Sequence, residues 1–475
     1  MRSQPTLAER LAQQACAFYQ DRKRLPATLS ARAAAHLLDY LGNALGGSVV
    51  PSSDTLRAAF SHVPAGSATV IGGAGVALPE YAALLNGAFA HALEMDDTHQ
   101  PSSTHPGAVV IPAALAAAEQ IDASGRELLA AIVAGYEVMA RLGMALGPAA
   151  QYARGFHPTS VCGVFGAAAA AGLLLDATPG QLAMAFGTAG SQAGGLLEFL
   201  GDGSLVKRLH PGWAAHGGLI AVRLALAGFG GPVTVFEGAH GLFGAFSGAA
   251  RPQPLLDADW SAPQLLRTSI KAHACCRYNQ APLDALLQCR REGEVQADDV
   301  ESVELGVLSV AWDVIAEPRE RKLDPQTVVD AQFSLPYGAA VALRFGRAGV
   351  QEHREELLRD PAVRTLMPRV HCVRDATLDA AYPQRWPATA RLRSRDGREF
   401  RARVEFPKGD PENPLSPTEL EAKFRSLAGV AAPDAALATI VRRIAELDEA
   451  PSVKPLCAAL SKQAVGAVSA GQGRR

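Results

Sequence analysis

Residues 124–147, SGRELLAAIVAGYEVMARLGMALG, decide the fold class, because their apolar residues recur at the spacing of an α-helix. The segment ends in glycine, which often terminates a helix. Similar patterns fill the chain from residue 5 to about 268, among them residues 30–47, with Ser30 as N-cap, and residues 178–200. No convincing strand pattern of any length interrupts this half. We therefore predict a large helical domain.

The pattern changes after about residue 270. Residues 300–312, VESVELGVLSVAW, alternate apolar and polar side chains, as a half-buried strand does. Residues 388–406 contain two such runs joined by Asp396–Gly397, a strong hairpin signal. Helical patterns lie near residues 280–291 and 330–346. This part is predicted to be a small α+β domain.

Helical patterns return near the end of the chain. Ser416, Pro417 and Glu419 form a capping box with proline in the first helical turn, and residues 433–450 predict another helix. The fold class is therefore predicted to be mainly α. Residues 1–268 and 407–462 would build the helical domain, residues 269–406 would form an inserted α+β domain, and residues 463–475 would be a flexible tail.

Composition excludes several classes of partner. The chain has 475 residues, of which 48% are hydrophobic and 19% charged, and its formal net charge is −2. This balance provides no general basic field for nucleic acid or an anionic membrane. Seven cysteines are scattered without a C-x-x-C pair, and the first residues lack the apolar core of a secretory signal. We expect a cytoplasmic protein that binds neither nucleic acid nor membrane.

The stretch EMDDTHQPSSTHPGAVVIP (94–112) concentrates polar residues inside an apolar region. If residues 79–98 form one helix, Glu94, Asp97 and Thr98 share a face and Asp96 points elsewhere. The alternative is that Asp97, Thr98 and a nearby serine cap helix ends. The residues alone leave both interpretations open.

His105 precedes a predicted buried helix and is followed by proline, and His157 stands in the same context. Free N–H groups at a helix start favour anions, so both positions suit a bound carboxylate. A structural cap is the alternative for His157. Neither the six-residue spacing of His99 and His105 nor that of His210 and His216 matches a zinc signature, and we predict no catalytic metal.

Two further stretches carry cations. Ser204 and Lys207 fit S-x-x-K, a weak match without its companion motifs. A lysine in a largely apolar half of the chain can act as a general acid or base, since desolvation lowers its pKa. Lys271 lies with other cations at the predicted domain junction, and Tyr337 starts a helix rich in small residues. We expect small ligands to bind in a cleft at such a junction.

Together these stretches resemble the MmgE/PrpD family, which contains 2-methylcitrate dehydratases, cis-aconitate decarboxylases and an iminodisuccinate epimerase. The resemblance spans about residues 5 to 460. Its motifs are HALEMDDTH (91–99), STHPGAVVIPAALAAAE (103–119), GFHPTSVCGVFGAA (155–168), GDGSLVKRLHPGWAAHGG (201–218), GPVTVFEGAHGLFGAF (231–246), IKAHACCRYNQAPLDALL (270–287) and PKGDPENPLS (407–416). The resemblance implies a large helical domain with a smaller α+β lid, a homodimer, and no metal or organic cofactor.

In the decarboxylase branch of that family, an acidic residue, a threonine, two histidines, a lysine and a tyrosine line the site. Carried over by motif, these are Glu94, Thr98, His105, His157, Lys207 and Tyr337. Glu94 departs from the aspartate of that branch, and the loop from Thr98 to His105 is one residue longer here.

The predicted function is a cofactor-independent lyase acting on a small di- or tricarboxylate by acid–base proton transfer. It would be a dehydratase of the 2-methylcitrate type or a related decarboxylase. Predicted catalytic residues are His105, His157 and Lys207, and predicted substrate-binding residues are Glu94, Asp97, Thr98, Lys271 and Tyr337. An epimerase of a dicarboxylate is the alternative, followed by a non-catalytic polycarboxylate-binding protein.

Overall fold

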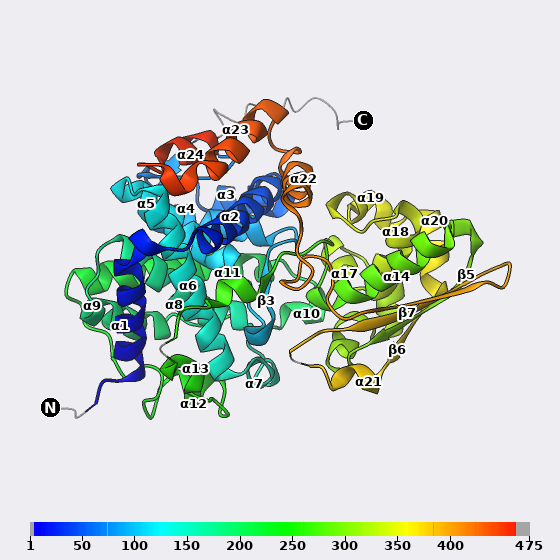
Figure 1. The fold of residues 1–475 in the computed structure, drawn as a ribbon, viewed down its shortest axis with the longest axis horizontal. Helices are drawn as coiled ribbons and strands as arrows, with labels where there is room; N and C mark the ends of the chain where they lie inside the picture. The colour runs from blue at the N-terminus through cyan, green and yellow to red at the C-terminus, as the bar shows by residue number, and fades with distance from the viewer. Residues whose placement is uncertain (1–3, 74, 258, 383, 462–475) are drawn as a thin grey trace. The chain divides into compact units, whose positions relative to one another are not determined.

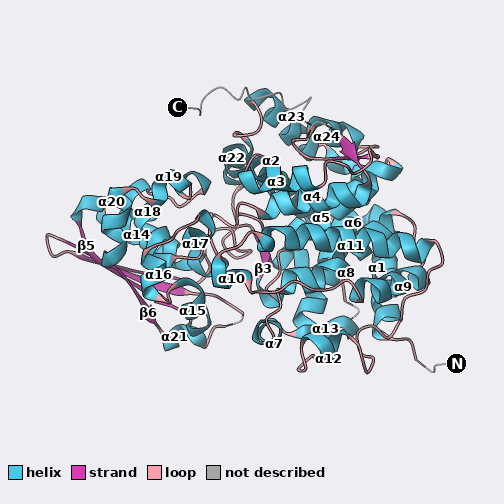
Figure 2. Ribbon diagram, turned by 180° about the vertical axis from the view of Figure 1, so that it is seen from behind, coloured by secondary structure: helices cyan, strands magenta, loops and turns pink. Residues whose placement is uncertain are grey.

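The computed structural model describes residues 4–73, 75–257, 259–382 and 384–461, so the predicted tail 463–475 lies outside the described residues. Helices dominate the fold, as Figure 2 shows, and the prediction of a mainly α protein is confirmed. The chain divides into two compact units. The first unit contains the residues up to Thr268 and those from Ser416 onward, and the second contains Ser269–Leu415.

The first unit is a helical assembly with three two-residue strand segments. Its helices are α1 (Leu7–Gln20), α2 (Ala27–Ser48), α3 (Pro51–Ala59), α4 (Pro79–His91), α5 (Gly107–Ile121), α6 (Gly125–Leu146), α7 (Pro148–Ala153), α8 (Pro158–Leu174), α9 (Pro179–Gly190), α10 (Phe199–Asp202), α11 (Val206–Leu226), α12 (Leu242–Phe246), α13 (Gln253–Leu256), α22 (Pro417–Ala428), α23 (Asp434–Ala445) and α24 (Lys454–Ala459). Its strand segments are β1 (Ala68–Thr69), β2 (Val76–Ala77) and β3 (Thr98–His99).

Helix α8 forms the centre of the first unit. All of its residues are buried, and α5, α6, α9 and α11 pack against it. A helix that is apolar on every side needs such complete cover. Its many alanines and glycines allow the neighbouring helices to approach closely. The core of the unit is therefore built around a helix with mostly small side chains.

Helix α6 corresponds to the segment that predicted the fold class. Ser124 accepts a hydrogen bond from the Glu127 backbone in a capping box, and the helix ends at Gly147. By length and composition α6 could cross a membrane, but 94% of its most apolar window is buried inside the protein. That burial is typical of a core helix.

A helix near the C-terminal end of the described residues packs against a helix near the N-terminal end. Helix α22 packs against α2, and Figure 1 shows the orange α22 beside the blue α2. Ser416 and Glu419 form the predicted capping box. The first unit is thus assembled from segments far apart in the sequence.

Three predicted helix boundaries are wrong. Helix α2 starts at Ala27 after Pro26, so Ser30 lies inside it. The helix predicted over 178–200 ends at Gly190, and Gly195 has a φ of +107°, which no helix can accommodate. The helix predicted over 79–98 ends at His91, because Glu94 adopts a left-handed φ of +55°.

The second unit combines helices with one sheet. Its helices are α14 (Gln280–Gly293), α15 (Trp312–Ile315), α16 (Arg319–Leu323), α17 (Val328–Gln332), α18 (Leu335–Phe345), α19 (Glu355–Leu358), α20 (Pro361–Leu366) and α21 (Ala376–Asp379). Its sheet has the order β6-β5-β7-β8, with β5 (Val300–Val307), β6 (Val370–Arg374), β7 (Ala388–Ser394) and β8 (Glu399–Val404). Strand β4 (Thr268–Ser269) lies at the boundary between the units.

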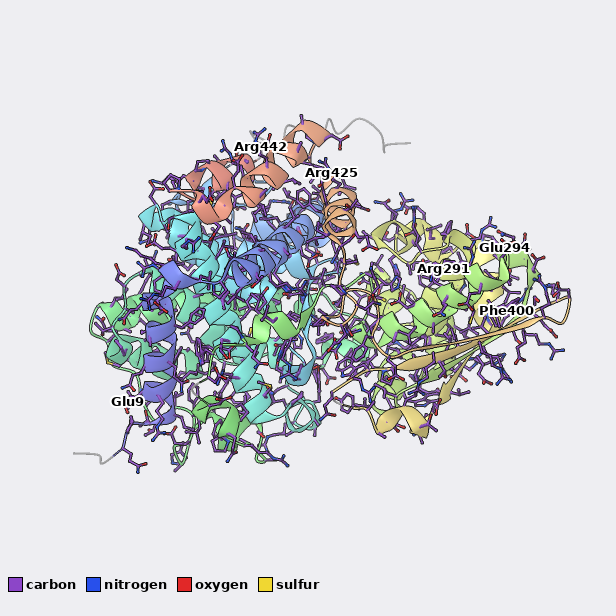
Figure 3. The ribbon with its side chains drawn as sticks, viewed as in Figure 1. Glu9, Arg291, Glu294, Phe400, Arg425 and Arg442 are labelled. Atoms are coloured by element: carbon purple, nitrogen blue, oxygen red, sulfur yellow. The ribbon has the colours of Figure 1, made fainter. Side chains whose placement is uncertain are left out.

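The predicted hairpin is present in this sheet. Strands β7 and β8 pair antiparallel, and Gly397 between them has a φ of +85°. Strand β5 pairs antiparallel with β7 and parallel with β6. Helix α14 packs on β7 and β8, where the Phe400 ring, labelled in Figure 3, lies so close to Gly293 that a Cβ there would collide with it.

The segment 407–415 belongs to the second unit, whereas the sequence prediction placed it in the helical domain. The backbone N–H of Ile270 donates to the carbonyl of Gly409 at 2.9 Å. Arg277 donates to both carboxylate oxygens of Asp410, at 2.7 and 2.9 Å. These buried bonds explain why the segment does not join α22.

Candidate active site

Close packing of α4 and α11 brings the candidate site together. Gly87 and Gly212 face each other across the two helices, and a Cβ on Gly212 would collide with the carbonyl of Leu84. Glycine at these positions lets the backbones approach closely. The C-terminal end of α4, with His91, therefore lies near the first turns of α11, with His210.

Four imidazoles form a cluster inside the first unit. The ring centroids of His91 and His105 are 5.1 Å apart, those of His91 and His157 are 6.1 Å apart, and those of His157 and His210 are 5.3 Å apart. The ring of Phe199 packs against His157 and His210. The cluster joins the ends of α4, α8 and α11 with the loop before α5.

His105 is held in a defined orientation. Its Nδ1 lies 2.7 Å from the backbone carbonyl oxygen of Asp97 and 3.2 Å from the hydroxyl of Thr98. Its backbone N–H donates to the hydroxyl of Thr159 in the first turn of α8. Because a carbonyl only accepts, Nδ1 carries the proton and Nε2 has the lone pair in the neutral ring.

His157 is the residue that precedes α8, as predicted. Its backbone N–H donates to the carbonyl of Gly195, and its Nδ1 lies 3.1 Å from Nδ1 of His210. Burial, and then the charge of Lys207, lower the pKa of His157 well below its usual value. Burial also lowers the pKa of His210 to about 4. Both rings are therefore neutral near pH 7, and one donates its Nδ1 proton to the other.

Lys207 and Glu94 form a buried ion pair between Nζ and Oε1. Lys207 lies in the first turn of α11, and Glu94 lies in the loop after α4 with its left-handed φ of +55°. A non-glycine residue in this region is strained and is held there by its surroundings. The structure thus brings together Glu94, Lys207 and the histidine cluster.

Asp97 lies on the other side of this loop. Its Oδ1 accepts a hydrogen bond from the Gly107 backbone N–H at the start of α5, at 2.9 Å. Its Oδ2 accepts from the Tyr136 hydroxyl at 2.6 Å and lies 2.9 Å from Nδ1 of His36. These contacts correspond to the capping alternative, so the side chain holds α5 in place within the interior.

Asp96 and His91 also belong to the histidine cluster, although the sequence predicts Asp96 on another helix face and assigns no role to His91. Asp96 Oδ2 lies 2.7 Å from Nδ1 of His91 and 3.5 Å from Nδ1 of His105. A single helix over residues 79–98 would direct Asp96 away from Glu94 and Asp97, but α4 ends at His91, so this direction does not apply. The sequence places His210 with Lys207 in a cationic cluster near a site, and its position three residues after Lys207 puts both on one face of α11.

Thr98 and His99 form the short strand β3 with different roles. The hydroxyl of Thr98 faces His105, whereas the His99 ring contacts Ser102 at 2.7 Å and Gln264 at 3.1 Å. Burial lowers the pKa of His99 to about 3. His99 is therefore a neutral, structural histidine.

The other two predicted site residues lie in the second unit. Lys271 is almost completely buried. The Tyr337 hydroxyl donates to the backbone carbonyl of Glu352 at 2.9 Å, and burial raises the pKa of this tyrosine. Their roles in substrate binding stay predictions.

Within the described ranges, no group of three or more His, Cys, Asp or Glu side chains is arranged to hold a metal ion. The imidazoles of the cluster instead contact one another and Asp96. The site therefore offers proton-transfer groups and one buried lysine.

Comparison with known proteins identifies the family. The model of the MmgE/PrpD N-terminal domain matches residues 9–255, and that of the MmgE/PrpD C-terminal domain matches residues 273–447. The chain is 30% identical to the cis-aconitate decarboxylase-like protein oryM of Aspergillus oryzae, over 92% of this chain and 94% of that protein.

Two further relatives are cis-aconitate decarboxylases. That of Aspergillus terreus is 28% identical, over 91% of each chain. That of Mus musculus is 29% identical, over 78% of this chain and 77% of the relative. Decarboxylases are carboxy-lyases, and the prediction of an enzyme of the lyase class is confirmed. The chain belongs to the MmgE/PrpD family.

Proposed function

We propose that this protein is a carboxy-lyase that acts on a small tricarboxylate of the cis-aconitate type through its own side chains. The observation that carries the proposal is the convergence of His105, His157 and Lys207 from three segments of the first unit. The names of the relatives support the reaction class.

The chemistry requires an acid, and often a base. When CO2 leaves, the broken carbon–carbon bond leaves an electron pair on the substrate, delocalised towards a neighbouring carboxylate. A new C–H bond must then form with a proton from a side chain. A base is needed as well where the double bond of an unsaturated substrate moves by removal of a C–H proton.

His105 and His157 suit these two tasks. The contact with the Asp97 carbonyl fixes the neutral His105 ring with its lone pair on Nε2, which suits a base. His157 is a neutral ring whose tautomer depends on His210. When His210 donates, His157 carries its proton on Nε2 and can act as the acid.

Lys207 provides the positive charge for a substrate carboxylate. It is buried, and there a charged donor stabilises developing negative charge more strongly than it does in water. Glu94 balances this charge in the ion pair. We propose that Lys207 turns towards the substrate carboxylate while Glu94 keeps it in position, and that Lys271 and Tyr337 contribute to binding.

A hydro-lyase of the 2-methylcitrate dehydratase type is the second candidate. Two imidazoles with opposite proton occupancy suit removal of a proton and protonation of a leaving hydroxyl. An epimerase would use the same groups without a leaving group. We also propose that the enzyme is a cytoplasmic homodimer that needs no cofactor, and light scattering of the purified protein tests the dimer.

A substrate panel tests the proposal. Purified protein is incubated with cis-aconitate, citrate, 2-methylcitrate and iminodisuccinate, and products are followed by NMR and by CO2 release. We expect CO2 release from cis-aconitate, and a loss of about 10²-fold or more in His157→Ala and Lys207→Ala. Loss of water or exchange of a C–H proton without CO2 release would favour the dehydratase or the epimerase, respectively.

His216→Ala is the matched control for these variants. His216 lies on α11 like Lys207, but its ring stacks on Trp213 at 5.4 Å and packs against Tyr81. Its removal should leave turnover within about threefold. Near-wild-type turnover in both His157→Ala and Lys207→Ala would contradict the proposed roles.

A further inference from the structure

We infer that Asp96 is a positioning residue that holds His91 and His105 and stabilises the protonated form of His105. This inference rests on the proposed function, because His105 is the proposed base. It adds the Asp96–His91 pair, which neither the sequence prediction nor the family resemblance had assigned to the site.

The geometry places one carboxylate oxygen between two rings. Asp96 Oδ2 is 2.7 Å from Nδ1 of His91 and 3.5 Å from Nδ1 of His105. Asp96 and His91 are buried, with exposed fractions of 2% and 0%. A carboxylate only accepts, so His91 donates its Nδ1 proton to Asp96.

His91 has one buried ring nitrogen, Nε2, without a hydrogen-bond partner among the described residues, as His36 does beside Asp97. A buried polar atom of this kind costs stability, and such atoms call for a functional explanation. The His91 ring packs against both His105 and His157, whose own centroids are 6.4 Å apart, and is inclined at 29° to the ring of His157. His91 therefore supports both proposed proton-transfer residues.

Burial alone does not explain why Asp96 contacts the histidine cluster, as a comparison with the neighbouring Asp97 shows. The two neighbouring carboxylates are equally buried, with exposed fractions of 2% and 3%. Asp97 bonds to the start of α5, to Tyr136 and to His36, a histidine outside the cluster, and these contacts stabilise the fold. Asp96 makes its contacts with imidazoles of the cluster. The pair resembles the arrangement of a base with an orienting carboxylate.

The charge of Asp96 acts on the proton-transfer step. When Nε2 of His105 takes a proton from the substrate, the ring becomes positive, and Asp96 keeps its negative charge beside it. Asp96 interacts electrostatically with Asp39 on α2 and Tyr136 on α6. Lys207 and His210 on α11 act on His157, the third ring of the cluster, and Lys207 is paired with Glu94. Asp96 itself lies 3.5 Å from His105 Nδ1 and favours the protonated form of that ring.

The test compares Asp96→Asn with Asp97→Asn. The asparagine at position 96 keeps the size and one accepting oxygen but removes the charge. We expect kcat to fall about 10²-fold with KM within about threefold. The acidic limb of the kcat/KM profile should move to lower pH, because the imidazolium loses its stabilising charge. Asp97→Asn should lower Tm and leave that limb in place.

A second readout does not need a substrate. The pKa of His105 is followed by NMR titration of its Cε1–H signal, assigned by its loss in His105→Gln. We expect this pKa to be lower in Asp96→Asn than in the wild type, even if the substrate panel shows no turnover. The failure of the inference can thus be told from the failure of the proposed function.

If Asp96→Asn does not fold, His91→Gln replaces it, since the amide N–H still donates to Asp96. It should keep the pKa of His105 and lower kcat about tenfold. An unchanged pKa of His105 in Asp96→Asn, or unchanged kcat in His91→Gln where Asp96→Asn does not fold, overturns the inference.

Discussion

Nδ1 of His105 lies 2.7 Å from the backbone carbonyl oxygen of Asp97, so the neutral ring presents its lone pair at Nε2. His105→Asn can keep the hydrogen bond to this carbonyl but has no group at the position of Nε2. We therefore predict that its Tm stays within a few degrees of wild type while kcat falls about 10²- to 10⁴-fold. Calorimetry and steady-state kinetics measure both quantities. Activity within tenfold of wild type would rule out His105 as the base.

The Lys207–Glu94 pair makes a second prediction. Lys207→Met removes the ion-pair partner of the buried Glu94 carboxylate, which should destabilise the protein by about 3–5 kcal/mol. The double variant Glu94→Gln/Lys207→Met removes both charges and should recover much of this loss without recovering activity. Thermal unfolding of Lys207→Met, Glu94→Gln and the double variant measures the coupling between the two side chains. Equal instability in Lys207→Met and the double variant would contradict the pairing.

Lys423 on α22 is predicted to hold the loop that carries Glu94. Its Nζ donates to the backbone carbonyl of Met95 at 2.8 Å and lies 2.5 Å from Asp39 Oδ1. Lys423→Met should lower both Tm and kcat, because it frees the loop and leaves Asp39 without this charge. Arg425, labelled on α22 in Figure 3, bonds to Glu421 near the surface and provides the control. Arg425→Met should change neither quantity by much.

The buried histidines predict how stability depends on pH. Burial lowers the pKa of His99 to about 3 and that of His210 to about 4, below the usual value of 6.5. The unfolded chain therefore binds more protons than the folded chain below pH 6.5. These groups stabilise the fold fully above about pH 6.5, and this contribution is lost as the pH falls towards about 4 for His210 and about 3 for His99. Asp39, whose pKa burial raises to about 6, acts in the opposite direction.

Tm measured between pH 7.5 and 5.0 should accordingly fall towards the acidic end. His99→Gln removes one of these groups, so its Tm should be lower at pH 7.5 and should depend less on pH. A steeper dependence in His99→Gln than in the wild type would show that this histidine is charged in the folded protein.

Local sequence signals predicted much of the fold. The Ser416–Glu419 capping box and the Asp396–Gly397 turn are formed as expected, because each depends on residues next to one another. The prediction of Ser30 as an N-cap is wrong, because α2 starts one turn earlier, after Pro26. The backbone at Glu94 could not be foreseen, because tertiary contacts hold a non-glycine residue in a left-handed conformation.

The grouping of several candidate residues was predictable in the same way. His105, His157, Lys207 and Glu94 come together in the first unit, as the motifs suggested. The different contacts of Asp96 and Asp97 could not be predicted from the sequence, because they depend on where α4 ends. One residue of helix more or less exchanges the directions of neighbouring side chains.

We propose that this enzyme cleaves a small tricarboxylate by proton transfer through the histidine cluster. The most direct test is an NMR time course in D2O of wild-type protein and His105→Asn with cis-aconitate. We expect CO2 release with solvent deuterium bound to carbon in the wild-type product, and at least a 10²-fold slower reaction in His105→Asn. Tight binding without turnover by the wild type, or equal rates in both proteins, would contradict it.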